Sequence, residues 1–350
     1  MLTPKENYLM CLRGEVPEWV PMYTMGAFPG WEWDLPSQIF EPPILGEHRL
    51  NNGGPDLWGV NYVATDSAEM ALIPDNSSFI LPLDDLPRWR EIIKAPDFSD
   101  VDWEQTVKKH FDMIPIDRKQ TAVAFALHFG YFQHLVSFMG FEDAMIAMYE
   151  EPELVHELLH YLSDFYIGVV EKTIDLYQPD TLCLMDDTAS WNAPFISVDM
   201  YREFVLPHHA KFTRYGRERG LPMTMHNCGK SEAFFDLLTG IGITAWDPAQ
   251  TSNDLDAVKK KYGNSLVLMG GWDGRERLVD PLQSPEHPDG VTEEEIRQSV
   301  RDSIDRLAPG GGYCFLGGFL VAVGDEENRK KNYIVNDEAS KYCKTFYKTH

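Results

Sequence analysis

The stretch Pro222-Met-Thr-Met-His-Asn-Cys-Gly229 joins a short apolar run to an abrupt polar end. Strands that are buried on both faces of a parallel sheet have continuous apolar runs of this length. The pattern recurs along the second half of the chain, in residues 181–187, 243–247, 266–273 and 313–318. Because amphipathic stretches separate these runs, the sequence predicts alternating βα units around a parallel sheet.

Two of the intervening segments have clear helix signals. One helix is expected to begin near Pro152. Another is expected to follow Thr292, because Thr292 and Glu295 can form a capping box, and this helix should end at Gly310-Gly-Gly312. Each segment keeps one apolar stripe, which consists of Leu154, Leu158, Leu162, Phe165 and Val169 in the first and of Ile296, Val300, Ile304 and Leu307 in the second.

The first part of the chain is less regular. Val20–Met25 and Ala122–Leu127 are predicted strands, and residues 30–118 between them are rich in Pro, Trp and Asp. We expect a single (β/α)₈ TIM-type barrel domain over residues 1–350, with this segment as an irregular excursion over the barrel mouth that includes a small hairpin. A doubly wound open sheet is the alternative, which is weakened because no G-x-G-x-x-G sequence follows a predicted strand.

Composition limits the function. The formal net charge is −24, so nucleic acid and anionic membranes are unfavourable partners. Five cysteines in 350 residues do not suggest a disulfide framework. We find no apolar segment typical of a signal peptide or a transmembrane helix, and we expect a cytoplasmic protein.

Polar residues at the strand ends are the candidates for chemistry, because barrel active sites lie at the carboxyl ends of the strands. His226, Cys228 and Cys314 offer one imidazole and two thiolates, which suit a zinc ion with an open fourth position. The alternative is that Cys314 is an ordinary buried cysteine and that the H-x-C pair is fortuitous.

Four acidic residues also follow predicted strands. Asp186 and Asp187 are candidate catalytic residues, which orient substrate or bond to His226, or else cap the next helix. Asp247 and Asp273 are candidate substrate contacts. Polar residues of a nearby helical stretch are expected to be structural or exposed; they are Glu203, His208 and His209.

Aromatic residues cluster in the excursion and after the second predicted strand. They are expected to line a substrate pocket under the lid of the barrel, or else to belong to the core. The members are Trp31, Trp33, Trp58, Tyr62, Phe129, Tyr131 and Phe132.

Several stretches resemble the uroporphyrinogen decarboxylase superfamily. They cover most of residues 120–325 and the segment Arg13–Pro21. The quoted stretches are Met185-Asp-Asp187 with Met200–His209, Met225-His-Asn-Cys-Gly229, and Asp254–Gly263 leading to Leu268–Asp273. The H-x-C pair with a distant third cysteine is similar to the zinc methyltransferase branch that works with corrinoid proteins. The resemblance implies that His226, Cys228 and Cys314 bind zinc.

The resemblance also implies a reaction. The expected activity is that of an O-demethylase methyltransferase, which transfers the methyl group of a methoxylated aromatic to cob(I)alamin on a corrinoid protein. Zinc would act as a Lewis acid on the ether oxygen, with Asp186 or Asp187 as proton donor. One alternative is methyl transfer from the corrinoid to a thiol or tetrahydrofolate; another is a non-catalytic corrinoid-handling subunit. A decarboxylase fits poorly, because Met22–Pro29 lacks the arginines that would receive substrate carboxylates.

Overall fold

A curled parallel sheet forms the centre of the computed structural model, which describes residues 2–24, 31–64, 72–127, 130–272, 291–318 and 325–349. Its seven strands run in the order β1 (Ser37–Phe40), β5 (Ala122–Leu127), β6 (Thr181–Met185), β7 (Met223–His226), β8 (Ala245–Ala249), β9 (Val267–Gly271) and β10 (Tyr313–Leu316). Met22 forms a parallel bridge with Phe315 and so adds a further chain segment beside β10. This arrangement confirms the TIM-type barrel class.

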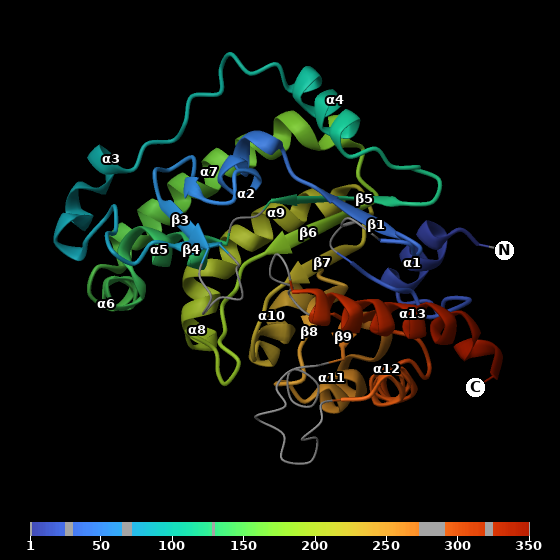
Figure 1. Cartoon of the computed structure of the whole chain (residues 1–350). Helices are drawn as coiled ribbons and strands as arrows, with labels where there is room; N and C mark the ends of the chain where they lie inside the picture. Colours follow the sequence, from blue (N-terminus) through green and yellow to red (C-terminus); the bar gives the residue numbers. More distant parts are fainter. Residues whose placement is uncertain are drawn as a thin grey trace.

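Helices surround this sheet, as Figure 1 shows. Helices α7 and α9 pack together beside β5 and β6, and α12 packs against α13. The α-helices in this half are α5 (Tyr131–Met139), α6 (Phe141–Glu150), α7 (Pro152–Tyr177), α8 (Val198–Met200), α9 (Leu206–Glu218), α10 (Phe235–Gly240), α11 (Leu255–Tyr262), α12 (Glu293–Leu307) and α13 (Glu326–Thr349). A π-helical turn, η4 (Tyr201–Val205), joins α8 to α9, and short 3₁₀ turns occur at η5 (Glu232–Phe234) and η6 (Gly263–Ser265).

Both helix predictions are confirmed at their amino ends. Helix α7 begins at Pro152, and α12 has the capping box of Thr292 and Glu295 with both hydrogen bonds made. The three glycines before β10 all have positive φ, a conformation that glycine adopts without the steric penalty of a Cβ atom.

The excursion at residues 30–118 contains more structure than the sequence indicates. Residues Ser37–Phe40 form β1, a strand of the central sheet that pairs in parallel with β5. The sequence does not predict β1, because this strand has only four residues and lacks a long apolar run. A small antiparallel sheet follows, with β2 (Gly54–Pro55), β3 (Asn61–Ala64) and β4 (Leu72–Pro74), and the remaining elements are η1 (Pro43–Leu45), α2 (Glu47–Leu50), η3 (Leu83–Arg88), α3 (Trp89–Ile92) and α4 (Trp103–Met113).

Helix α1 (Pro4–Leu12) packs its buried side chains against residues that alternate along the barrel strands. The Tyr8 hydroxyl lies 3.9 Å from the sulfur of Met269, and the Sγ atoms of Cys11 and Cys314 are 3.8 Å apart. Since Cys314 and Cys11 are both fully buried, this contact places Cys314 in the packed interior beneath α1.

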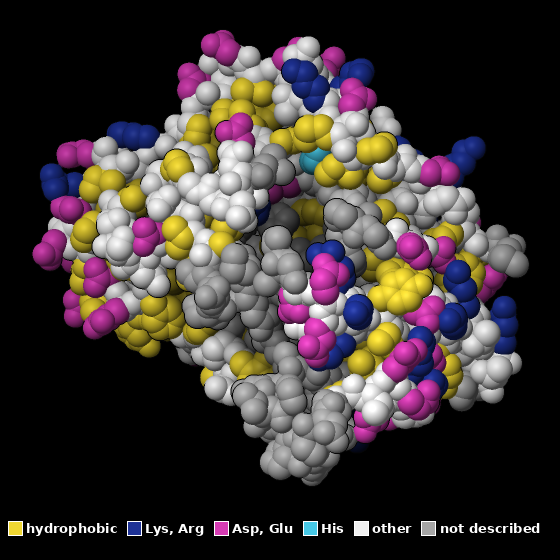
Figure 2. All heavy atoms as spheres, in the orientation of Figure 1, with side chains coloured by type: hydrophobic (Ala, Val, Ile, Leu, Met, Phe, Trp, Pro, Cys, Tyr) yellow, Lys and Arg dark blue, Asp and Glu magenta, His cyan; other side chains and the backbone are white. Residues whose placement is uncertain are grey.

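Charged side chains of both signs lie on the surface of the molecule. Figure 2 shows Lys and Arg side chains interspersed among Asp and Glu over the visible face. Among the described residues, none of the helices combines the length and apolar character that a membrane span requires.

A buried histidine in the excursion makes stability depend on pH. His110 is 6% exposed, its Nδ1 lies 2.9 Å from the Tyr177 hydroxyl, and burial lowers its pKa to about 4. The unfolded chain binds the proton more strongly, so the stability that neutral His110 provides is complete above about pH 6.5 and is lost towards pH 4. We predict that the free energy of unfolding falls by about 1–3 kcal/mol more in the native chain than in His110→Gln over this range. Urea denaturation of both proteins at each pH measures the difference; parallel pH profiles would contradict the prediction.

Candidate metal centre

Four hydrogen bonds link the residues at the carboxyl end of β6 to those at the carboxyl end of β7. The backbone N–H of Asp186 donates to the His226 carbonyl (3.1 Å), and Asp187 Oδ1 accepts from the Cys228 N–H (2.7 Å). Thr188 and Asn227 exchange two further bonds, of 3.1 and 2.8 Å. These contacts fix the Asp187 carboxylate beside Cys228.

The loop after β7 also needs a glycine. Gly229 has a φ of +86°, and a Cβ atom at this position would lie 2.4 Å from the Ala189 carbonyl oxygen. A side chain there would push the two loops apart, so the close approach depends on glycine at this position.

His226 is oriented by Asp247 of the neighbouring strand. Nδ1 of His226 lies 2.9 Å from Oδ2 of Asp247, whose carboxylate is fully buried. Burial by itself lowers the pKa of His226, but the Asp247 carboxylate and the nearby Cys228 outweigh this effect and hold the pKa well above its usual value. A carboxylate on one imidazole nitrogen is the arrangement that directs the other nitrogen to a metal ion.

Three donor groups converge at this point. Ligand atoms of Asp187, His226 and Cys228 lie within 4.8 Å of one another, and they form the one such group of three among the described residues. His226 Nε2 is 3.5 Å from Cys228 Sγ. One nitrogen and one sulfur on a tetrahedral zinc ion would be about 3.6 Å apart, so the residues present fit such an ion.

Cys314 is not brought to this group. It lies within β10, its side chain is fully buried, and its Sγ contacts Cys11 rather than His226 or Cys228. Burial raises the pKa of the Cys314 thiol well above its usual value, and it also raises the pKa of Cys228, so the position of the sulfur, not its pKa, separates the two cysteines. The structure thus shows Cys314 in a packing contact with Cys11, which favours the alternative that the sequence left open.

Asp186 also differs from Asp187 in its surroundings. It is fully buried and accepts hydrogen bonds from the backbone N–H groups of Phe132 and Gln133 (both 3.2 Å) at the amino end of α5. His209 Nε2 is 3.1 Å from the same carboxylate, and His209 Nδ1 is 2.8 Å from the Tyr201 hydroxyl. Asp186 thus caps a helix, although this helix precedes it in the chain. The sequence gives no local signal for its pairing with His209, because the two residues meet only across elements.

The expected aromatic pocket is dispersed. Trp58 is buried and donates from Nε1 to the Tyr166 hydroxyl (2.8 Å), Tyr62 packs against His48, and Tyr131 packs against His208 and His209. Trp31 packs edge-on against Trp33, which in turn contacts Tyr333 of α13. Phe129 and Asp273 lie outside the described residues.

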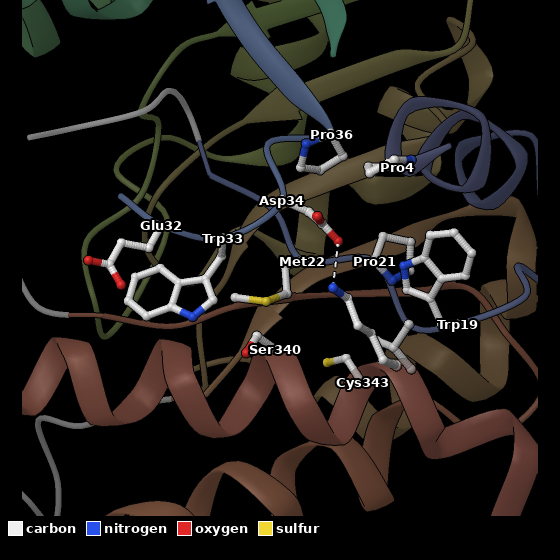
Figure 3. A pocket seen from close by; sticks show the side chains of 12 residues that line it. Pro4, Trp19, Pro21, Met22, Glu32, Trp33, Asp34, Pro36, Ser340 and Cys343 are labelled. Carbon is white, nitrogen blue, oxygen red and sulfur yellow. Dashed lines mark ion pairs between the residues drawn. The ribbon is translucent and has the colours of Figure 1, made fainter. Parts of the chain in front are cut away.

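Trp33 instead lines a cavity of about 110 Å³ between α1, the segment at Val20–Met22 and α13, as Figure 3 shows. Asp34 and Lys344, which also line the cavity, form an ion pair with a distance of 3.1 Å. None of the donors at the ends of β6 and β7 lines this cavity. Substrate contact by these aromatic residues stays a prediction.

The fold and the site define a class: a parallel α/β barrel with a cluster of metal-type ligands at the carboxyl ends of its strands. The family model for uroporphyrinogen decarboxylase (URO-D) matches residues 91–324. The chain therefore belongs to the uroporphyrinogen decarboxylase family.

Individual relatives match more locally. The chain is 29% identical over 159 residues to a methylated-thiol–coenzyme M methyltransferase of Methanosarcina mazei. The matched segment covers 44% of this chain and 37% of that protein. It is 29% identical over 150 residues to a uroporphyrinogen decarboxylase of Mycolicibacterium vanbaalenii, with 39% of this chain and 41% of that protein covered. These matches span less than half the length of either relative.

A solved structure extends the comparison to the whole chain. A methyltransferase from Methanosarcina mazei superposes with a TM-score of 0.60 over 97% of this chain and 99% of that one, at 14% sequence identity. The two proteins share their fold.

The closeness of α5 to Asp186 yields a stability prediction. A Cβ atom on Gly130 would lie 1.8 Å from Asp186 Oδ1, so Gly130→Ala should displace the carboxylate and destabilise the protein by about 1–3 kcal/mol. Gly168 within α7 is the matched control, because a Cβ there meets nothing within 4 Å and Gly168→Ala should stabilise by about 0.5–1 kcal/mol. Chemical denaturation measures both changes; equal effects of the two substitutions would refute the proposed clash.

Proposed function

We propose that this protein is a zinc-dependent methyltransferase that transfers the methyl group of a methoxylated aromatic to cob(I)alamin on a corrinoid protein. The observation that carries the proposal is the convergence of Asp187, His226 and Cys228 at the strand ends. Two of the similar proteins are methyltransferases by name, one of them acting on methylated thiols. These names support methyl transfer as the reaction class.

The donor set favours zinc among the common metals. A thiolate and an imidazole are poor ligands for Mg²⁺ or Ca²⁺, which prefer oxygen, and both suit Zn²⁺. In this proposal Asp187 takes the position that the sequence assigned to Cys314. A set of three protein ligands leaves one coordination position for substrate.

Each residue near the metal has a distinct task. When bound, zinc would supply a Lewis acid for the ether oxygen, whose negative charge grows as the methyl group leaves. Asp247 holds the His226 ring in place, and the Cys228 N–H holds the Asp187 carboxylate. Asp186 is enclosed and bonded to three donors, so it serves to position the loop and is a poor candidate for proton transfer to substrate.

Two other functions follow from the comparisons. A methylcorrinoid-to-thiol methyltransferase would use the same metal to activate a thiol, and the named thiol methyltransferase favours this alternative. A decarboxylase is suggested by the second relative, but Met22–Pro29 contains no arginine for substrate carboxylates.

The ligand assignment is tested by two cysteine substitutions. We predict that Cys228→Ser lowers the zinc content to well below that of the native chain, since it removes the thiolate, and that Cys314→Ser retains the metal because this sulfur contacts Cys11. Asp187→Asn should also lower the zinc content, because it removes a charged oxygen ligand. Elemental analysis of the three purified variants measures the metal. Loss of zinc in Cys314→Ser, with retention in Cys228→Ser, would overturn the assignment.

The direction of methyl transfer is tested by following the corrinoid spectrum. With reduced corrinoid protein and a panel of methoxyarenes, we expect methylcobalamin to form in step with a phenoxide, which takes a proton from solvent to give the phenol. Electron-withdrawing ring substituents should speed the reaction where chemistry limits the rate, because they stabilise the leaving oxygen. Methanol and methylamines serve as control donors. Consumption of methylcobalamin on addition of a thiol or tetrahydrofolate, without any response to methoxyarenes, would show that the alternative direction is correct.

A further inference from the structure

A buried chain of three polar side chains ends at Asp186, the neighbour of Asp187 in sequence. Its members are Tyr201 of η4, His209 of α9 and Asp186 itself, and all three are fully buried. Nδ1 of His209 lies 2.8 Å from the Tyr201 hydroxyl, and Nε2 lies 3.1 Å from Oδ2 of Asp186. Because buried polar groups are costly without partners, these contacts hold the three side chains in one arrangement.

The π-helical turn η4 explains how Tyr201 meets His209. The two residues are eight positions apart. In a regular α-helix, eight residues rotate by about 800°, which leaves the two side chains about 80° apart around the axis. A π-helical turn takes up an extra residue, so it returns them to nearly the same face. Pro207 at the start of α9 has no N–H to continue the regular hydrogen-bond ladder, which favours such a turn here.

One order of donors and acceptors satisfies the three groups. An ionised carboxylate only accepts hydrogen bonds, so the Nε2–H of His209 donates to Asp186. Nδ1 then accepts from the O–H of Tyr201. The imidazole is thereby held at both nitrogens, and it keeps the Asp186 carboxylate at a fixed place relative to α9.

The position of Asp186 in turn governs the metal-type donors. Its backbone N–H donates to the His226 carbonyl (3.1 Å), and the next residue, Asp187, accepts from the Cys228 N–H (2.7 Å). A shift of Asp186 would therefore move the Asp187 carboxylate away from Cys228. Two adjacent residues thus divide the work, because one is anchored in the interior and the other presents its oxygen to the ligand group.

Tyr201 also contacts the segment that follows the other ligand loop. Its ring stacks on Phe234, with centroids 4.4 Å apart and ring planes 19° apart. Phe234 belongs to η5, the first helical turn after Cys228. The loops after β6 and β7 therefore both depend on where Tyr201 lies.

We propose that Tyr201 and His209 are positioning residues of the metal centre. They act through Asp186, which they hold so that Asp187 stays beside Cys228. Neither residue is one of the metal-type donors. Outer partners of this kind orient the ligands of a metal ion and raise its affinity. The inference rests on the proposed function, in which Asp187 is a zinc ligand, and it names two residues that set how tightly the site binds.

Zinc affinity, measured by competition with a chromogenic chelator, tests the proposal. We expect His209→Leu to weaken zinc binding about tenfold, because Asp186 loses its imidazole donor. His209→Gln should restore most of the affinity, since its amide offers an N–H at a similar reach. Tyr201→Phe should have a smaller effect of the same sign. His110→Leu is the matched control, because His110 is a buried histidine of α4 that also meets a tyrosine hydroxyl through Nδ1; it should bind zinc as the native chain does.

A double-mutant cycle separates positioning from a general loss of stability. If His209 acts on the metal through Asp187, His209→Leu should cause no further loss of zinc affinity once Asp187→Ala has removed the carboxylate. An equal loss in both backgrounds would overturn the proposal, because it would show a structural role only. Weakening of zinc binding by His110→Leu to the same degree would overturn it as well.

Amide hydrogen exchange of the metal-free, full-length protein tests the same contacts without zinc. The Cys228 N–H should exchange faster in His209→Leu than in the native chain or in His110→Leu, because its acceptor on Asp187 is released. Circular dichroism checks the fold, and Tyr201→Phe replaces His209→Leu if that variant does not fold. Unchanged protection of this amide would overturn the positioning role. Absence of zinc binding by the native chain would instead refute the proposed function, and the exchange result would still decide whether the buried chain holds Asp187.

Discussion

The parallel register of three neighbouring strands is the constraint on which the site depends. Met185 of β6 pairs with His226 of β7, and His226 pairs with Asp247 of β8. The register therefore brings three strand ends to one level, with Asp187 two residues beyond the first of them. Residues about 60 positions apart in sequence become neighbours because parallel strands end on the same face of the barrel.

Hydrogen bonds to buried polar groups then hold the ends of β6, β7 and β8 in position. Asp186 is enclosed by two backbone N–H groups and by His209, and Asp247 is bonded to His226. A buried carboxylate without such partners would be strongly unfavourable, so each of these contacts restricts where the loops can lie. The oxygen Oδ1 of Asp247 is buried and has no partner among the described residues, while Oδ2 lies 2.9 Å from Nδ1 of His226. A carboxylate behind a histidine of this kind favours a cation at the site.

The candidate metal centre combines oxygen, nitrogen and sulfur donors at the strand ends, where the loops of a barrel converge. This position suits a catalytic role for the site. The chain belongs to the uroporphyrinogen decarboxylase family, and the local match to a methyltransferase supports methyl transfer as the reaction class.

The sequence by itself determined the barrel class, most of its strands and the boundaries of the clearest helices. Local periodicity and capping residues carry this information, because they depend on neighbours in the chain. It also singled out His226 and Cys228, which leave the same strand two residues apart and belong to the one group of metal-type donors among the described residues; their binding of zinc stays a prediction. It did not identify β1, whose four residues form a strand only by pairing with β5.

Tertiary structure decided the rest of the candidate site. Cys314 looks like a ligand in sequence because a strand ends nearby, yet its position within β10 directs the sulfur to Cys11 beneath α1. Adjacent aspartates have indistinguishable contexts in the chain, but strand alternation buries Asp186 under α5 and leaves Asp187 beside Cys228. Which donors share one ion depends on distances between separate elements. Residue order does not specify those distances until the strands have paired.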